Sequence, residues 1–216
     1  MSACAGVIAW WRFDALVGGR ALDVGDGGRH LLADAGARLV AGLDGFAVAL
    51  DGASFRVDDA ALSLAQWTIE IAVAPDDVTT DQVIIERPGA GTPPDVGLNY
   101  ALRVFDGGLS HVFRGAGGAD QVARGDIVAS MWNPITASYG SSPATLAVTI
   151  GDARTAVSPT AGPSVGAGPL PLFVGRSGRD DQQARFTGAI DALRVLDHAL
   201  TPAETSKYPR LSWTTP

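Results

Sequence analysis

Apolar residues recur at every second position in many short segments that are separated by Gly, Pro and Asp. This period of two predicts β-strands that bury one side against a core. The clearest segment is Trp67–Val73, in which a tryptophan, two isoleucines and a valine alternate with the outward-facing Thr68 and Glu70. Further strands are expected at Val7–Phe13, Ala47–Leu50, Ser54–Val57, Gln82–Arg87, Tyr100–Phe105, Leu109–Arg114, Ile135–Tyr139, Thr145–Ile150, Ala153–Val157, Leu172–Gly175 and Phe186–Leu196.

Turn residues between these segments indicate how two of them pair. The sequence Asp-Gly-Gly at 106–108 separates Tyr100–Phe105 from Leu109–Arg114 and supplies the positive φ angles of a tight hairpin. These two segments are therefore expected to pair antiparallel. The alternation slips over Ile190–Leu193, which indicates a β-bulge or a strand that bends from one sheet to the other.

One helix is predicted, near the end of the chain. Thr201 stands at an N-cap position, Pro202 at the first helical position and Glu204 where a capping box places its carboxylate. A short helix that ends by Pro209 is expected. Because no shift in composition divides the chain, it is expected to form one domain over residues 1–210, followed by a tail over 211–216. Segments rich in Gly, Pro and Ser are expected to be loops, at Pro88–Gly97, Gly115–Gly118 and Ser158–Pro171.

Composition narrows the classes of partner. The 216 residues are 46% hydrophobic and 18% charged, enough apolar material for a packed core, and the net charge of −7 argues against binding nucleic acid. The single cysteine, Cys4, excludes an intrachain disulfide. The first residues lack the basic start of a signal peptide, and Arg12 and Asp14 interrupt the apolar stretch that follows. We therefore expect that the protein is made in the cytoplasm and does not insert into a membrane.

The order of segments resembles the laminin G-like jelly-roll family of the concanavalin A-like lectin and glucanase superfamily. The resemblance rests on the opening VIAWWRFD, the loop ALDVGDGGRHL, AVALDG, the strand WTIEIAV and the closing FTGAIDALRVLDHALTPAE. It implies an all-β fold, an antiparallel β-sandwich with one short C-terminal helix. The same sandwich serves as carbohydrate-binding module, protein-interaction module and structural component, so the resemblance alone does not fix the function.

The family resemblance also implies a structural calcium between the first loop and the closing strand. The matching positions are Asp23 and Asp191, with Asp26 as a third ligand, although Gly25 stands where the family usually has Ser. Aspartate suits such a site because hard cations take oxygen ligands from short side chains in loops. The alternative is that these aspartates cap turns and accept backbone hydrogen bonds.

No arrangement of residues indicates catalysis. Glycosidases of the superfamily place paired carboxylates along one strand, usually as Glu-x-Asp-x-x-Glu, and the sequence has no such run. Glu70 is followed by Ile71 and Ala72, so it lacks a partner two residues on. The three histidines lie in separate segments, and no Gly-x-Ser-x-Gly turn presents a serine. The chain is therefore expected not to be an enzyme and to need no cofactor other than the calcium.

Tryptophans at the two ends of the chain are candidates for an interface. Trp10 and Trp11 are adjacent in the first strand and must point to opposite sides of it, and Trp213 lies in the tail. Either the tail docks onto a neighbouring subunit, or it folds back over the edge of the sandwich. The interface hypothesis allows a homo-oligomer.

We therefore expect a non-catalytic interaction module, a component of a larger particle such as a bacteriophage virion. The alternative is a lectin-like protein that recognises cell-surface glycans. Incorporation into a particle and binding on a glycan array distinguish the two.

Overall fold

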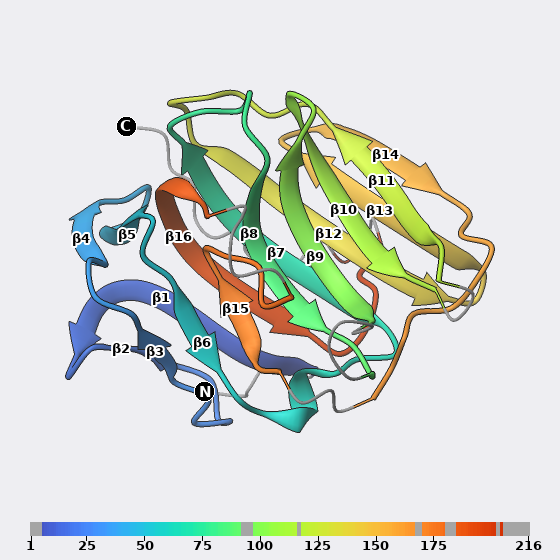
Figure 1. Cartoon of the computed structure of the whole chain (residues 1–216), viewed down its shortest axis with the longest axis horizontal. Coiled ribbons are helices and arrows are strands. Elements are labelled where there is room, and N and C mark those ends of the chain that lie inside the picture. The colour runs from blue at the N-terminus through green and yellow to red at the C-terminus, as the bar shows by residue number, and fades with distance from the viewer. Residues whose placement is uncertain are drawn as a thin grey trace.

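The protein is built almost entirely from antiparallel strands, as its computed structural model shows for residues 6–91, 97–115, 118–166, 170–179, 185–201 and 204 (Figure 1). The strands are β1 (Val7–Val17), β2 (Arg20–Asp23), β3 (Leu31–Ala33), β4 (Arg38–Ala41), β5 (Phe46–Asp51), β6 (Phe55–Val57), β7 (Trp67–Pro75), β8 (Gln82–Pro88), β9 (Leu98–Phe105), β10 (Gly108–Arg114), β11 (Asp120–Gly125), β12 (Asn133–Ser141), β13 (Ala144–Ile150), β14 (Ala153–Val157), β15 (Leu172–Val174) and β16 (Thr187–Leu196). A 3-10 turn, η1 (Ala60–Leu62), precedes β7.

The strands form two layers that are joined along one side. Hydrogen bonding runs without a break in the order β11-β10-β9-β8-β15-β6-β3-β2-β1-β16-β7-β12-β13-β14. Strands β6, β15 and β8 to β11 make the front layer in Figure 1, and β1, β16, β7 and β12 to β14 make the back layer. The short strands β2 and β3 connect them. This is the sandwich of a jelly roll, as the sequence predicts.

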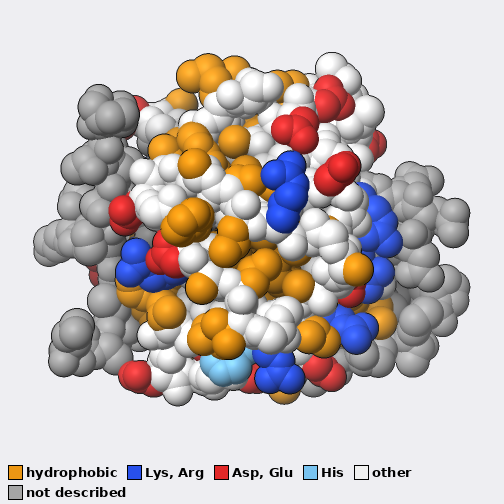
Figure 2. All heavy atoms as spheres, turned by 90° about the vertical axis from the view of Figure 1, so that its left-hand side faces the viewer, with side chains coloured by type: hydrophobic (Ala, Val, Ile, Leu, Met, Phe, Trp, Pro, Cys, Tyr) orange, Lys and Arg blue, Asp and Glu red, His pale blue; other side chains and the backbone are white. Residues whose placement is uncertain are grey.

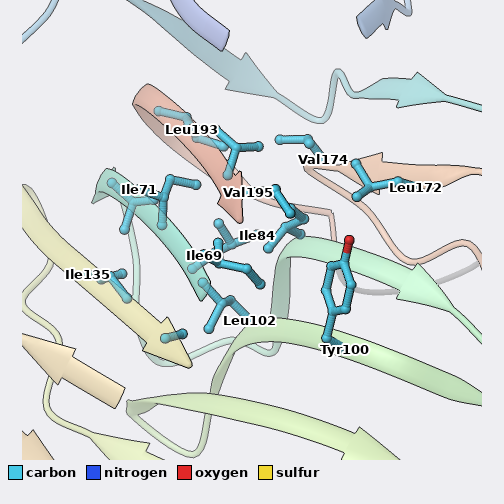
Figure 3. Close-up of a cluster of buried hydrophobic side chains, with 14 of the residues drawn as sticks. Ile69, Ile71, Ile84, Tyr100, Leu102, Ile135, Leu172, Val174, Leu193 and Val195 are labelled. Atoms are coloured by element: carbon cyan, nitrogen blue, oxygen red, sulfur yellow. The ribbon is translucent and has the colours of Figure 1, made fainter. Parts of the chain in front are cut away.

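The core lies between the two layers and is filled by alternate side chains from both. Figure 3 shows isoleucines of β7 and β8 meeting valines of β15 and β16 there. Trp67 sits among other rings, with centroids 5.3 Å from Tyr100, 4.9 Å from Tyr139 and 5.8 Å from Phe113. Large rings offset in this way contribute more than their buried area alone.

The pattern of alternation locates most of the strands correctly. Each of the twelve predicted segments overlaps a strand, and the hairpin at 106–108 pairs Phe105 with Gly108. The predicted bulge in the closing strand is confirmed by the shift in register between Asp191 and Arg194. Because of this bulge, β16 pairs with β5 through Thr187–Ile190 and with β1 through Leu193–Leu196.

Four strands were not predicted: β2, β3, β4 and β11. They contain three to six residues, and β4 is nearly exposed on both sides, so no apolar period marks them. The predicted helix after Thr201 falls almost wholly outside the described residues. Of its expected capping contacts, Thr201 N donates to Glu204 Oε2 at 2.9 Å. Within the described part of the chain, no helix is long and apolar enough to cross a membrane.

Thr68 and Glu70 correct one detail of the prediction. They lie on the side of β7 away from Trp67, as expected, but they are buried rather than exposed. Thr68 Oγ1 donates to the carbonyl of His198 at 2.8 Å, and Glu70 accepts a hydrogen bond from Arg194 Nε at 2.6 Å. The back layer is therefore covered on its outer side near β7 and β16.

Candidate functional site

The outer side of the front layer carries a row of side chains that its strand register brings together. Phe173 of β15, Glu86 of β8, Ala101 of β9, Val112 of β10 and Val122 of β11 each lie opposite the next. Their sequence neighbours point into the core instead, because successive side chains of a strand alternate. The result is a largely buried floor of apolar side chains, with the carboxylate of Glu86 between Phe173 and Ala101.

Arginines surround this floor. We call the outer side of β6, β15 and β8 to β11, together with the segment 175–179 that follows β15, the arginine face. Three of its arginines stand on β9, β10 and β11, one stands on β6, and two stand in the segment 175–179. They are Arg56, Arg103, Arg114, Arg124, Arg176 and Arg179.

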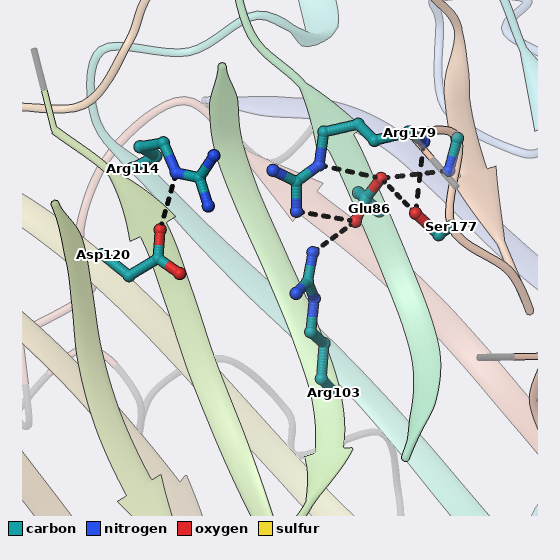
Figure 4. A network of polar contacts seen from close by, with 7 residues as sticks. Glu86, Arg103, Arg114, Asp120, Ser177 and Arg179 are labelled. Atoms are coloured by element: carbon teal, nitrogen blue, oxygen red, sulfur yellow. Dashed lines mark hydrogen bonds and ion pairs between the residues drawn. The ribbon is translucent and has the colours of Figure 1, made fainter. Parts of the chain in front are cut away.

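Glu86 is the centre of a polar network on this face (Figure 4). Its side chain is fully buried, and its Oε2 atom accepts a 2.6 Å hydrogen bond from Arg103. Its Oε1 atom accepts from Ser177 Oγ at 3.1 Å and from the backbone N–H of Gly178 at 3.0 Å. The Nε atom of Arg179 lies 3.4 Å from the same oxygen. A buried carboxylate is stable only with such partners, so Glu86 fixes both guanidinium groups in place.

The segment 175–179 is held against β8 and β15 by close backbone contacts. Gly175 N donates to the carbonyl of Ile84 at 2.8 Å, and Arg179 N donates to Ser177 Oγ at 3.1 Å. A Cβ atom on Gly178 would lie 2.3 Å from the ring of Phe173. A side chain at position 178 would therefore displace either the segment or the ring of Phe173.

Aromatic rings support two further arginines. The guanidinium carbon of Arg176 lies 4.4 Å from the ring centroid of Phe173, and that of Arg124 lies 5.3 Å from the centroid of Phe105. Arg114 is paired instead with Asp120, whose carboxylate oxygen is 2.8 Å from its Nε atom. Rings and carboxylates thus hold the guanidinium groups in defined directions.

The arrangement provides planar hydrogen-bond donors beside an apolar floor. Arg103 and Arg179 each commit part of the guanidinium group to Glu86, and their side chains remain 25% and 16% exposed. Guanidinium groups bind pairs of oxygen atoms in one plane, and a rigid surrounding shell reduces the cost of ordering them. This arrangement suits a ligand rich in hydroxyl or carboxylate oxygens.

The aspartates predicted to bind calcium do not come together as one site. Asp23 is buried, and its Oδ1 atom accepts from the backbone N–H of Trp10 and Gly25, both at 2.9 Å. Its Oδ2 atom accepts from the backbone N–H of Arg29 at 3.0 Å. Asp26 lies on the exposed loop between β2 and β3. Among the described residues, no three His, Cys, Asp or Glu side chains form a group that could hold a metal ion.

Asp191 has a different neighbourhood, in the bulge of β16. Its Oδ2 atom accepts from the backbone N–H of Leu43 at 2.8 Å and of Asp44 at 3.3 Å. Burial raises the pKa of Asp191, the two backbone bonds lower it, and the nearby carboxylates of Asp14 and Asp44 raise it. The carboxylates of Asp23 and Asp191 thus act as backbone acceptors in separate turns, and the residues present do not fit the calcium site that the resemblance implies.

The tryptophans predicted at an interface separate into two environments. Trp10 and Trp11 point to opposite sides of β1, as predicted. Trp11 is fully buried in the core, where its Nε1 atom donates to the carbonyl of Arg29 at 2.6 Å, so it is not available to a partner. Trp10 is half-buried on the outer side, with the guanidinium carbon of Arg194 5.6 Å from its ring centroid. Trp213, like Cys4, lies outside the described residues.

Sequence reasoning missed the arginine face. Its central residues, Glu86, Arg103 and Arg179, are far apart in the chain and meet only through strand pairing and the segment after β15. One local signal was available: Glu86 and Arg87 follow a run of three apolar residues in a strand whose every position is buried. An ionisable side chain in such a strand requires a partner of opposite charge.

The sequence was compared with protein families and with curated proteins. A family model described as the concanavalin A-like lectin/glucanases superfamily matches residues 48–206. The search of curated proteins finds no match.

Solved structures with the same fold include domains of a glycan-degrading enzyme and of bacterial toxins. Domain 4 of AbnA, a GH43 extracellular arabinanase from Geobacillus stearothermophilus, in complex with arabinotriose, is 20% identical, with 94% of this chain and 97% of that chain covered and a TM-score of 0.71. The binding domain of Paraclostridial Mosquitocidal Protein 1 is 14% identical, with 94% and 51% covered and a TM-score of 0.69. The binding domain of Botulinum Neurotoxin DC in complex with SialylT is 9% identical, with 99% and 53% covered and a TM-score of 0.69. The chain spans about half of the two toxin domains.

Proposed function

The chain belongs to the concanavalin A-like lectin/glucanases superfamily, and on this basis we propose that it is a non-catalytic carbohydrate-binding module whose glycan site is the arginine face. The observation that carries the proposal is the fully buried Glu86, which fixes Arg103 and Arg179 beside the floor of Ala101 and Val112. Binding sites typically combine an apolar surface with a few well-placed polar groups. Two structures with this fold, the arabinanase domain and the neurotoxin domain, are complexes with arabinotriose and with SialylT.

The charges on this face support binding rather than hydrolysis. Glycoside hydrolysis uses two carboxyl groups on either side of the scissile bond, one of which must donate a proton. Glu86 is occupied by Arg103, Arg179, Ser177 and Gly178. The other carboxylates of the described face, Asp106 and Asp120, lie 3.6 Å and 2.8 Å from arginine nitrogens.

A glycan array with wild-type protein and an Arg179→Ala variant tests the proposal. Loss of a charged hydrogen bond to a ligand weakens binding by about tenfold or more. We therefore expect the wild type to bind a subset of glycans and Arg179→Ala to lose most of that signal. Arg38→Ala serves as the matched control, because Arg38 is exposed on β4 and lies outside the arginine face. Absence of glycan binding by wild-type protein with a normal melting temperature would contradict the proposal.

A second function, as a subunit of a larger particle such as a virion, is favoured by one observation. Exposed apolar side chains gather on the side of the molecule formed by β1 to β5, which Figure 2 shows from the front. Exposed apolar side chains that gather on one side of a protein are typical of interfaces. The large apolar residues that are exposed between positions 17 and 46 are Val17, Leu22, Val24, Leu32, Leu39 and Phe46.

The particle hypothesis has its own test. Phe46→Ser should leave the melting temperature nearly unchanged and weaken assembly with the neighbouring subunit, measured by light scattering on the purified protein or by incorporation into particles. Met131→Ser is the control, since Met131 is 61% exposed but lies between β11 and β12. Deleting Leu211–Pro216 tests separately whether the tail with Trp213 contributes to the interface.

A further inference from the structure

We propose, building on the proposed function, that the glycan is acidic and that Arg176 binds its carboxylate. The first reason is the charge of the arginine face. Its six arginines oppose three carboxylates, those of Glu86, Asp106 and Asp120, so the described face carries a net charge of +3. The whole chain has a net charge of −7.

This excess persists when the two carboxylates that directly follow the segment 175–179 are counted. Asp180 and Asp181 follow Arg179 in the chain and lie outside the described residues. Even with both carboxylates included, the sum is +1. A positive face on an acidic protein attracts anionic ligands and has little effect on neutral ones.

Arg176 is the residue of this face whose environment best suits a carboxylate. Its guanidinium carbon lies 4.4 Å from the ring centroid of Phe173, so the ring supports the group from one side. Its Nε atom has no hydrogen-bond partner, and Arg176 makes no ion pair with any described residue. Among the described residues, the charge of this guanidinium group is therefore not neutralised by a carboxylate, as the charges of Arg103, Arg114, Arg124 and Arg179 are.

The protein's own carboxylate next to it is already in use. Phe173 lies directly opposite Glu86 in the neighbouring strand. Because Arg176 lies over the ring of Phe173, it is next to the polar network of Glu86. Both oxygens of Glu86 are taken by Arg103, Ser177, Gly178 and Arg179. Arg56 lies on the other side of Phe173, opposite it on β6, and adds a second positive charge.

A carboxylate is a better match to this arrangement than a hydroxyl. It offers two coplanar oxygens to one guanidinium group, and the resulting charged hydrogen bonds are about twice as strong as neutral ones. The chemical class that follows is a glycan with a ring carboxylate, such as a uronic or a sialic acid. Free hydroxyls of the same sugar then meet Arg103 and Arg179.

A glycan array printed in matched pairs, each acidic glycan beside its neutral methyl ester, tests the inference. We expect the acidic member to be bound at least about tenfold more tightly, as befits a charged hydrogen bond pair. Isothermal titration of the best-bound acid and its methyl ester then quantifies the ratio. Rising NaCl should weaken binding of the acid and leave that of the ester nearly constant, because salt screens exposed charges.

Variants test whether Arg176 is responsible for the selectivity for the acid over its methyl ester. Arg176→Ala should bring the affinity for the acid down to that for the ester, without lowering the affinity for the ester. Arg154→Ala, an exposed arginine on β14 of the other layer, should leave both affinities unchanged. Equal binding of acid and ester by the wild type, or full selectivity in Arg176→Ala, overturns the inference and leaves the proposed function standing. Binding of no glycan at all, acidic or neutral, instead contradicts the proposed function.

Discussion

The indole Nε1 atom of Trp67 donates a 3.0 Å hydrogen bond to the Nε2 atom of His111, which joins β7 of one layer to β10 of the other through the core. The Nδ1 atom of His111 lies 2.9 Å from the carbonyl of Ala147, on β13. An imidazole that accepts at Nε2 and donates at Nδ1 is neutral. The buried histidine therefore links the two layers only in its uncharged form.

This link predicts a loss of stability in acid. Burial lowers the pKa of His111 to about 4 from an ordinary value of 6.5. The unfolded chain therefore takes up a proton below pH 6.5 while the folded protein does not, so stability present above pH 6.5 is lost as the pH falls toward 4. A shift of this size corresponds to about 3 kcal/mol. Chemical denaturation between pH 7 and 4 measures it.

A glutamine at position 111 provides the control for this effect. His111→Gln retains a donor and an acceptor and cannot titrate in this range. Its stability at pH 7 should be lower than that of the wild type, and its decline toward pH 4 should be shallower. Parallel pH profiles for the two proteins would show that the histidine does not contribute to acid sensitivity.

The buried pair of Glu70 and Arg194 predicts a strong effect on stability and none on binding. Glu70→Gln leaves the buried Arg194 without its carboxylate, and breaking such a pair typically costs about 3 kcal/mol. Glu70→Leu combined with Arg194→Met should recover most of the loss, because neither charge then remains. Glycan affinity should be the same in all folded variants, since the pair lies on the opposite layer from the arginine face. A change in affinity would place the ligand elsewhere.

The raised pKa of Asp191 should make stability depend on pH with a sign opposite to that expected for His111. Burial and the neighbouring carboxylates raise its pKa in the folded protein, so its contribution to stability is present below its unfolded pKa and is lost as the pH rises through the folded value. Asp191→Asn retains an oxygen acceptor for Leu43 and removes the charge. It should gain stability relative to the wild type as the pH rises from 4 to 7.

The effect of calcium on stability is tested with the wild type and Asp191→Asn. Because the carboxylates of Asp23 and Asp191 accept backbone hydrogen bonds in separate turns, we expect added calcium and chelator to leave the wild-type melting temperature unchanged. A ligand that binds only the folded state would raise it. A melting temperature that rises with calcium in the wild type and not in Asp191→Asn would restore the calcium site that the family resemblance implies.

The close contact of Gly178 with Phe173 allows a test of whether the position of the segment 175–179 controls glycan binding. Alanine at 178 would place its Cβ atom against the ring of Phe173, so either the segment or the ring that supports Arg176 must shift. We expect Gly178→Ala to weaken glycan binding by about tenfold or more, as for loss of one charged hydrogen bond. Gly162→Ala is the control for a general effect of alanine on stability, because nothing lies within 4 Å of its Cβ position and its φ angle is not positive. Undiminished binding by Gly178→Ala would remove the segment from the site.

Most strands can be predicted from the sequence, whereas the site cannot. The strand β7 is evident because its core-facing residues alternate over nine positions, whereas β4 has three exposed residues out of four and leaves no such period. The bulge at Asp191 is visible for the same reason, as a slip in a long alternation. Local pattern is sufficient where one side of a strand is buried and the other is not.

The site depends on contacts that no local pattern contains. Glu86 and Arg179 are 93 positions apart, and they meet because β15 pairs with β8 and the chain after it turns back over the sheet. The sequence directed attention to paired carboxylates and to tryptophans, and the structure places Trp11 in the core and an arginine cluster on the surface instead. Composition could not show this cluster either, because the chain as a whole is acidic.

The most direct test of the glycan site on the arginine face is its location by NMR. Isotope-labelled protein is titrated with the best-bound glycan from the array, and changes in backbone amide shifts are mapped onto the fold. We expect the largest changes at Ala101, Ser110, Val112 and the segment 175–179, with small changes on β12 to β14. Changes confined to the loops at 42–45 or to β1 to β5, with the arginine face unaffected, would contradict a glycan site on this face.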